Sequence, residues 1–136
     1  MVTYVLDSSA LLRYLDKEAG ALRVREILRA CSSYEAALCI SAVQWGEIAG
    51  KLRKRLGPVE GMRVLDGILL GEGEIVSATA ERAVRAAGLK VDRKISYADG
   101  FAIDLAMEAP DHVLVTADFD FKAVEDLARI EFLPAK

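Results

Sequence analysis

The order of its apolar segments constrains the fold of this 136-residue chain more than any other feature. Short runs of strand-forming residues alternate with longer stretches in which apolar residues recur at helical spacing. The short runs are apolar on both faces, as is typical of a parallel sheet covered by helices on both sides. The composition, 53% hydrophobic and 29% charged, supports a buried core. We therefore expect a single α/β domain over residues 1–136, built as a three-layer α/β/α sandwich with a mainly parallel central sheet.

The pattern predicts strands over residues 2–6, 36–40, 74–77, 112–116 and 130–133. It predicts helices over residues 21–31, 41–55, 59–70, 80–88, 96–108 and 119–127. Ser41 and Gln44 have the spacing of a capping box at the start of the second helix, and Gly57–Pro58 breaks that helix. An apolar stripe of Ala80, Ala83, Val84 and Ala87 defines the fourth helix, which we expect to end at Gly88.

Several classes of protein are excluded by composition. The longest uncharged run, residues 36–46, is shorter than the roughly 20 residues that a membrane-spanning helix needs, and the first residues lack the basic start of a signal peptide. Cys31 and Cys39 are the only cysteines and have apolar neighbours, so we expect reduced thiols in a cytoplasmic protein. A formal charge of −3 does not indicate a nucleic-acid binder by itself.

Two acidic residues mark the ends of predicted strands. Asp7 closes the first strand, and Asp118 follows the strand that ends at Thr116. In an open parallel sheet, ligands bind just outside the carboxyl ends of the strands. Each aspartate could alternatively serve only as a helix N-cap, for which Asp is a favoured residue.

Two further acids lie on predicted helices. Asp99 stands on a helix that is apolar on most sides, where a carboxylate is costly without a hydrogen bond, a countercharge or a metal. The alternative is that Ser96 and Asp99 form a capping box. Glu47 follows a buried strand by about two helical turns and can reach the same sheet edge. Its alternative is a surface pair with Lys51, four residues later.

Together, these four acids suggest one acidic pocket. Carboxylates packed closely raise one another's pKa, so such a pocket calls for a cation. Magnesium or manganese would suit it, because hard cations prefer carboxylate oxygens. A metal held there could activate a water and stabilise the leaving oxygen of a phosphodiester. The pattern therefore predicts a hydrolase of phosphate esters, with a nucleic-acid backbone as the expected substrate.

Four segments resemble the motifs of PIN-domain ribonucleases: residues 7–12, 41–47, 96–99 and 115–121. They occur in the family's order over nearly the whole chain, and the chain looks most like the VapC toxins of prokaryotic toxin–antitoxin pairs. The resemblance implies a magnesium-dependent endoribonuclease, often dimeric, that is silenced by a cognate antitoxin protein. Its RNA substrate would be hydrolysed by a metal-activated water in the cytoplasm.

The same resemblance assigns roles to individual residues. Asp7 and Asp99 match the principal metal-binding aspartates, and Glu47 and Asp118 match the two further acids, so all four are candidate catalytic and metal-binding residues. Ser8 and Thr116 match hydroxyl positions beside the site, and Asp120 stands where many members carry an acid. Asp104 lies about 140° around the helix from Asp99, so we expect it to face elsewhere.

Other functions remain possible at this point. A housekeeping PIN nuclease for ribosomal RNA processing and a non-catalytic PIN binding module share the same motifs. A phosphohydrolase with an aspartate nucleophile commonly has a second aspartate two residues after the first, whereas Ser9 stands there in this chain. The basic stretch of residues 51–55 could hold the RNA backbone or could be a solvated helix face.

Overall fold

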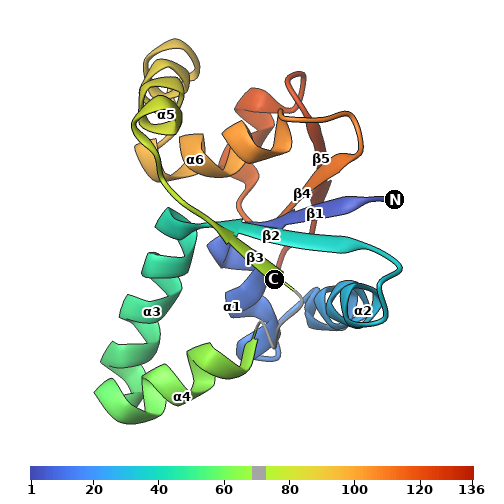
Figure 1. The fold of residues 1–136 in the computed structure, drawn as a ribbon, viewed down its shortest axis with the longest axis vertical. Helices are drawn as coiled ribbons and strands as arrows, with labels where there is room; N and C mark the ends of the chain where they lie inside the picture. The colour runs from blue at the N-terminus through green and yellow to red at the C-terminus, as the bar shows by residue number, and fades with distance from the viewer. Residues whose placement is uncertain (69–72) are drawn as a thin grey trace.

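The computed structural model of the protein describes residues 1–68 and 73–136. Within them, five strands form one sheet in the order β3-β2-β1-β4-β5, and each neighbouring pair is parallel (Figure 1). The strands are β1 (Thr3–Leu6), β2 (Ala37–Ser41), β3 (Gly73–Val76), β4 (His112–Thr116) and β5 (Arg129–Phe132). The predicted parallel sheet is confirmed, and β1 lies at its centre.

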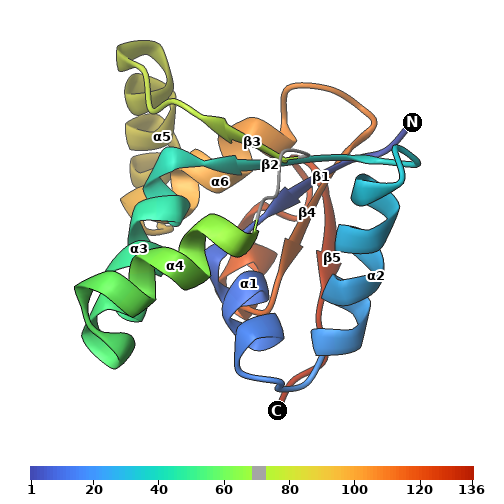
Figure 2. The ribbon, with the colours of Figure 1, turned by 60° about the horizontal axis from the view of Figure 1, so that its bottom comes forward.

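Helices cover both faces of this sheet. They are α1 (Ser8–Leu15), α2 (Ala21–Ser32), α3 (Ala42–Leu56), α4 (Pro58–Ile68), α5 (Ala80–Arg93), α6 (Tyr97–Ala106) and the 3₁₀ helix η1 (Phe119–Val124). In Figure 1, α1 to α4 lie on one side of the sheet, and α5 and α6 lie on the other. Figure 2 shows α3 and α4 running side by side as a helical hairpin. The predicted three-layer arrangement is confirmed.

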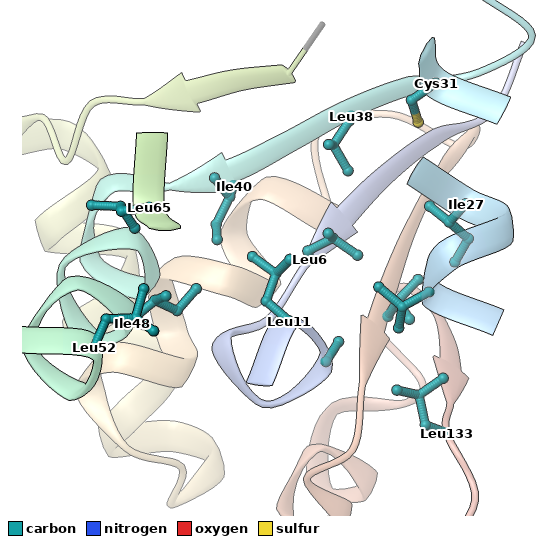
Figure 3. Close-up of a cluster of buried hydrophobic side chains, with 13 residues drawn as sticks. Leu6, Leu11, Ile27, Cys31, Leu38, Ile40, Ile48, Leu52, Leu65 and Leu133 are labelled. Carbon is teal, nitrogen blue, oxygen red and sulfur yellow. The ribbon is translucent and has the colours of Figure 1, made fainter. Parts of the chain in front are cut away.

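Alternate strand residues divide the core into two layers. Leu6 points into the layer formed with α1 to α4, and its neighbour Val5 points into the layer formed with α6 and η1. On β4, Val115 and Leu114 divide in the same way. Figure 3 shows the first layer, in which side chains from β1, β2, α1, α2, α3 and α4 meet. Both faces of the central strands are therefore buried, as their apolar runs predict.

The prediction that the fourth helix ends at Gly88 is wrong. Helix α5 continues to Arg93 and is capped by Lys94 in the left-handed conformation (φ 58°). A glycine inside a helix costs only about 1 kcal/mol, which packing against a neighbouring helix can offset. The stripe used for the prediction is not the packed face either: Val84 is exposed, whereas Ala86 is fully buried against α6.

The predicted helix over residues 119–127 is also wrong in type and length. The segment is a 3₁₀ helix that ends at Val124. Its two buried residues, Phe121 and Val124, are three positions apart and both enter the second core layer. Three residues per turn place them on the same side, so the 3₁₀ geometry buries both in the short connection between β4 and β5.

The remaining predicted elements are present, with ends shifted by a few residues. The C-terminal end of the predicted helix 59–70 lies outside the described residues, which resume at Gly73. Cys31 and Cys39 are buried free thiols. Among residues 1–68 and 73–136, no helix has both the length and the apolar character to cross a membrane.

Candidate active site

A polar pocket of about 500 Å³ opens at the carboxyl ends of β1, β2 and β4. The predicted site residues that line it are Asp7, Ser8, Glu47, Asp99, Asp118 and Asp120. They come from α1, α3, α6, η1 and the residues just before them, so the fold gathers positions up to 113 residues apart in sequence (120 − 7). The last predicted residue, Thr116, is buried and donates a hydrogen bond to Asp7.

Asp7 is the most deeply held of these carboxylates, with an exposed fraction of 3%. It directly follows β1 and caps α1, where its Oδ2 accepts hydrogen bonds from Ser9 Oγ (2.5 Å) and Thr116 Oγ1 (2.9 Å). Burial raises the pKa of Asp7 and the charge of Asp118 adds to the increase, while the hydrogen bonds from Ser9 and Thr116 oppose it. Asp7 is therefore both a helix cap and a pocket residue, so the two interpretations of it are compatible.

Ser9 is a site residue that the sequence analysis did not identify. Its hydroxyl donates to Asp7, accepts from the backbone N–H of Ala117 (2.9 Å) and lies 3.2 Å from Thr116 Oγ1. It thereby joins the start of α1 to the end of β4. The only local signal was its position two residues after a capping aspartate, which many helix starts share.

Asp99 lies at the first turn of α6 and lines the pocket. Ser96 caps this helix by accepting the backbone N–H of Asp99 (3.0 Å). Burial, followed by the charges of Asp7 and Asp118 and a smaller effect of Glu47, raises the pKa of Asp99 to about 7. The capping interaction therefore involves the Ser96 hydroxyl and the backbone of Asp99. The side-chain carboxylate of Asp99 belongs to the acidic pocket.

Glu47 reaches the pocket from the second turn of α3. Its Oε1 accepts a hydrogen bond from Ser8 Oγ (3.2 Å), which ties α3 to the start of α1. Desolvation by the pocket wall and the charge of Asp7 raise the pKa of Glu47, while Ser8 and Lys51 oppose this. The predicted surface pair with Lys51 has no direct contact in the described structure: Lys51 acts on Glu47 only through its charge.

Asp118 and Asp120 border the pocket on the side of η1. Asp118 is the N-cap of η1, and its Oδ1 accepts the backbone N–H of Asp120 (2.9 Å). The backbone N–H of Asp118 donates in turn to Thr116 Oγ1 (3.0 Å). A continuous set of hydrogen bonds therefore links Asp118 through Thr116 to Asp7.

The expected capping box at the start of α3 forms only in part. Ser41 caps the helix by accepting the N–H of Val43, but Gln44 turns into the core and is fully buried. Its Nε2 donates to the backbone carbonyl of Ala98 (2.5 Å), and its Oε1 is buried without a hydrogen-bond partner among the described residues. Gln44 thus connects α3, one turn before Glu47, to α6, immediately before Asp99.

Asp104 faces away from the pocket, as predicted. It is buried against α5, where it pairs with Arg82 Nη1 (3.0 Å) and Arg85 Nε (2.6 Å). Arg93, at the end of α5, pairs with Asp126 (2.7 Å). These arginines serve contacts within the protein, whereas Lys51 and Arg55 of the basic stretch line the pocket.

The carboxylates fit a hard divalent cation in chemistry. Among the described residues, however, no three His, Cys, Asp or Glu side chains lie close enough together to surround a metal ion in their present conformations. Magnesium is usually held by one or two carboxylates and keeps several waters, so an enclosing cage is not required. Burial raises the pKa of Asp99 and repulsion from Asp7 and Asp118 adds to the increase, and a bound cation would offset that repulsion.

A match over most of the chain shows the family to which the protein belongs. The family model of the PIN domain matches residues 4–127, from the second residue of β1 to beyond the end of η1. The chain belongs to the PIN-domain family. A sequence comparison with curated proteins finds no match.

The solved structures to which this PIN domain is similar include chains of toxin–antitoxin complexes. A chain of VapBC2 from Rickettsia felis, bound to a promoter DNA fragment, has a TM-score of 0.72 at 18% identity, covering 98% of this chain and 100% of that one. DNA-bound VapBC from Salmonella typhimurium gives 0.70 at 19% identity, covering 97% and 98%. VapC20 from Mycobacterium tuberculosis, a sarcin–ricin loop cleaving toxin, gives 0.65 at 17% identity, covering 96% and 99%.

At these identities, the structural matches establish a shared fold over nearly the full length of each chain. The predicted resemblance to PIN-domain proteins of the VapC type is confirmed at the level of family and fold. The roles of the individual pocket residues rest on their geometry in this PIN domain.

Proposed function

We propose that this PIN domain is a divalent-metal-dependent endoribonuclease and the toxin of a toxin–antitoxin pair. The observation that carries the proposal is the convergence of Asp7, Glu47, Asp99 and Asp118 on one pocket at the carboxyl edge of the sheet. These four residues would hold the metal and carry catalysis. Ser8, Thr116 and Asp120 would support the site.

The contacts of the site support a positioning role for its hydroxyl groups. Ser9 and Thr116 both bond Oδ2 of Asp7, which fixes the carboxylate while Oδ1 makes no hydrogen bond to any described residue. Ser8 fixes one oxygen of Glu47 in the same way. A carboxylate held through one oxygen presents the other to a ligand with little further loss of side-chain freedom.

Magnesium or manganese is the cofactor that we propose. When bound, such a cation would lower the pKa of a water and offset charge that develops on the phosphodiester. Asp99 would have to be ionised to bind it, so its raised pKa links metal affinity to pH. Asp7 and Asp99 would be the principal ligands, with Glu47 and Asp118 binding directly or through water.

The partners follow from the same proposal. The solved relatives include VapBC complexes, so we propose a cognate antitoxin as the protein partner and the cytoplasm as the location. RNA is the proposed substrate. We also propose that the protein is a homodimer. The alternatives are a PIN nuclease that processes ribosomal RNA and a binding module without activity.

Cleavage of a mixed RNA substrate tests the proposal. The purified protein should cut RNA internally with magnesium or manganese, and excess chelator should stop the reaction. Asp99→Asn should lower the rate by at least about a hundredfold, since it removes a proposed metal ligand and even the loss of a residue that only orients a metal ligand typically costs about 10- to 100-fold. Magnesium or manganese should also raise the Tm of the wild type by mass action, and of Asp99→Asn much less.

Asp104→Asn is the matched control on the same helix. It removes a carboxylate that pairs with Arg82 and Arg85 instead of facing the pocket. At a temperature where both variants are folded, Asp104→Asn should retain cleavage. Equal activity of wild type and Asp99→Asn would contradict the catalytic assignment, and the absence of both cleavage and metal response would favour the binding module.

A further inference from the structure

The pocket has two electrostatically different ends. One end contains the carboxylates of the four proposed metal-binding residues. The other end is bordered by three cations: Arg13 of α1, Arg55 of α3 and Lys136. At the cationic end, Arg55 Nη1 pairs with Asp16 Oδ1 (2.7 Å), and Lys136 pairs with Glu18. Lys51 lies between the two ends.

Lys51 differs from the other cations of the pocket in its contacts. In the described part of the chain, no carboxylate oxygen lies within 4.0 Å of its Nζ, the limit for an ion pair. Arg13, by comparison, donates to the backbone carbonyls of Ala19 (2.7 Å) and Pro134 (2.8 Å). Lys51 is therefore available to an anion from outside.

Helix α3 sets the spacing of these groups. Glu47, Lys51 and Arg55 follow one another at four-residue intervals and all line the pocket. At 1.5 Å of rise per residue, successive members are about 6 Å apart along the helix axis. This spacing is similar to that of neighbouring phosphates in an extended nucleic-acid strand. Arg55 uses only Nη1 for Asp16 in the described structure, so its other N–H groups can serve a phosphate.

We propose that Lys51 and Arg55 form a track for the backbone of single-stranded RNA, in which two consecutive phosphates contact them while the scissile phosphate lies at the carboxylates. The inference rests on the proposed ribonuclease function and identifies how its substrate is held. Lys51 would also offset the repulsion between the carboxylates and the incoming strand. The track fixes the direction in which the strand leaves the site, along α3 towards its C-terminal end.

Binding of short fluorescent RNA oligonucleotides, in chelator so that no cleavage occurs, tests the track. Lys51→Met keeps the apolar stem and removes the charge. It should weaken binding about fivefold at low salt and reduce the slope of log K against log salt by about 0.7, the value for one phosphate contact with a single strand. Lys54→Met is the matched control: Lys54 is exposed on the same helix and does not line the pocket, so both quantities should stay at the wild-type values.

Oligonucleotides with one neutral methylphosphonate locate the contact. One position should weaken binding to the wild type and have no effect on Lys51→Met, because the charge pair is already lost. The track would be overturned if Lys51→Met left the salt slope unchanged, or if Lys51→Met and Lys54→Met had equal effects. It would also be overturned if every methylphosphonate that weakens binding to the wild type weakened binding to Lys51→Met as much. An equal loss of affinity for a polyglutamate peptide would also overturn it, in favour of a general anion surface.

The outcome is separate from that of the proposed function. If the wild type cleaves RNA and Lys51→Met binds RNA normally, the ribonuclease function stands and the track is refuted. If Lys51→Met loses RNA affinity but the wild type cleaves no RNA under any metal, the track stands and the catalytic proposal is refuted.

Discussion

Asp99 and Asp104 stand five residues apart on α6, and their surroundings are opposite. Asp104 is buried between two arginines that stabilise its charge, whereas burial, together with nearby carboxylates, raises the pKa of Asp99 to about 7. The same residue type on one helix therefore stabilises the fold at one position and adds repulsion at the other. Such local repulsion is typical of a functional site, because a ligand is what removes it.

Gln44 combines a stabilising and a destabilising polar group in one side chain. Its Nε2 stabilises the junction of α3 and α6, and its Oε1 is buried without a partner among the described residues. An unsatisfied buried acceptor costs about 1–3 kcal/mol. We interpret Gln44 as a residue that fixes the separation of the helices carrying Glu47 and Asp99.

Replacing Gln44 with Met tests this interpretation. Gln44→Met should leave the free energy of unfolding within about 1 kcal/mol of wild type or raise it, because both polar atoms are removed together. RNA cleavage should nevertheless fall by about tenfold or more, because the two carboxylates are no longer held at a fixed separation. Chemical denaturation and cleavage kinetics measure the two effects.

Ile48→Leu is the control for this test, since it changes the packing of the same buried helix face without removing a polar contact. It should cost less than about 1.5 kcal/mol and keep full activity. A loss of several kcal/mol in Gln44→Met, with activity that falls only in proportion to the folded fraction, would show that Gln44 is a packing residue alone.

At the scale of elements, the contact between α5 and α6 decides where Asp99 lies. Gly100 is buried at this contact, and a Cβ added there would come within 2.8 Å of the backbone oxygen of Ala86 and 3.0 Å of its Cα. The two helices approach so closely only because residue 100 has no side chain. Asp99 is the adjacent residue, so the position of α6 against α5 also sets the position of its carboxylate.

Gly100→Ala should therefore destabilise the protein by about 1–3 kcal/mol, because backbone atoms cannot yield as a flexible side chain can. Gly88→Ala is the matched comparison inside a helix: beyond its chain neighbours and the backbone of its own helix, no atom of the described residues lies within 4 Å of the added Cβ, so it should stabilise the protein by about 0.5–1 kcal/mol. Thermal and urea unfolding of both variants provide the measurement. Stabilisation by both substitutions would refute the close approach of α5 and α6.

For the molecule as a whole, the formal charge of −3 is unevenly placed. Removing Asp7, Glu47, Asp99 and Asp118 from the count would change it to −3 + 4 = +1. The acidic excess is thus largely one pocket, so the net charge of the protein is no argument against an RNA substrate. The pocket does make the stability of the metal-free protein depend on pH.

The direction of that dependence follows from Asp99. Its pKa is about 7 in the folded protein, against about 3.9 when unfolded, so the folded state binds more protons between these values. Its contribution should favour folding fully below about pH 4 and be lost as the pH rises to about 7. With solvent screening, we expect a loss of about 1–2 kcal/mol over this range.

Urea unfolding in chelator, at several pH values between 4.5 and 7.5, checks this prediction. The difference in unfolding free energy between Asp99→Asn and wild type should grow in favour of the variant as the pH rises. Excess magnesium should reduce the difference, because the cation binds the ionised form in the wild type. A pH-independent difference would show that Asp99 titrates normally.

The sequence by itself determined the parallel sheet, the helices α2 to α6 and the acids at the carboxyl edge of the sheet, but it did not predict helix α1 (Ser8–Leu15). The predicted features are short-range properties: strand and helix periodicities are read within a few residues, and parallel strands bring their ends to one edge. The sequence did not determine that α5 passes through Gly88, that residues 119–124 form a 3₁₀ helix, or which contacts Ser9 and Gln44 make. Those depend on pairs far apart in the chain, such as Ser9 with Thr116 and Gln44 with Ala98. Only the tertiary structure decided them, because burial and close packing override local preference where distant segments meet.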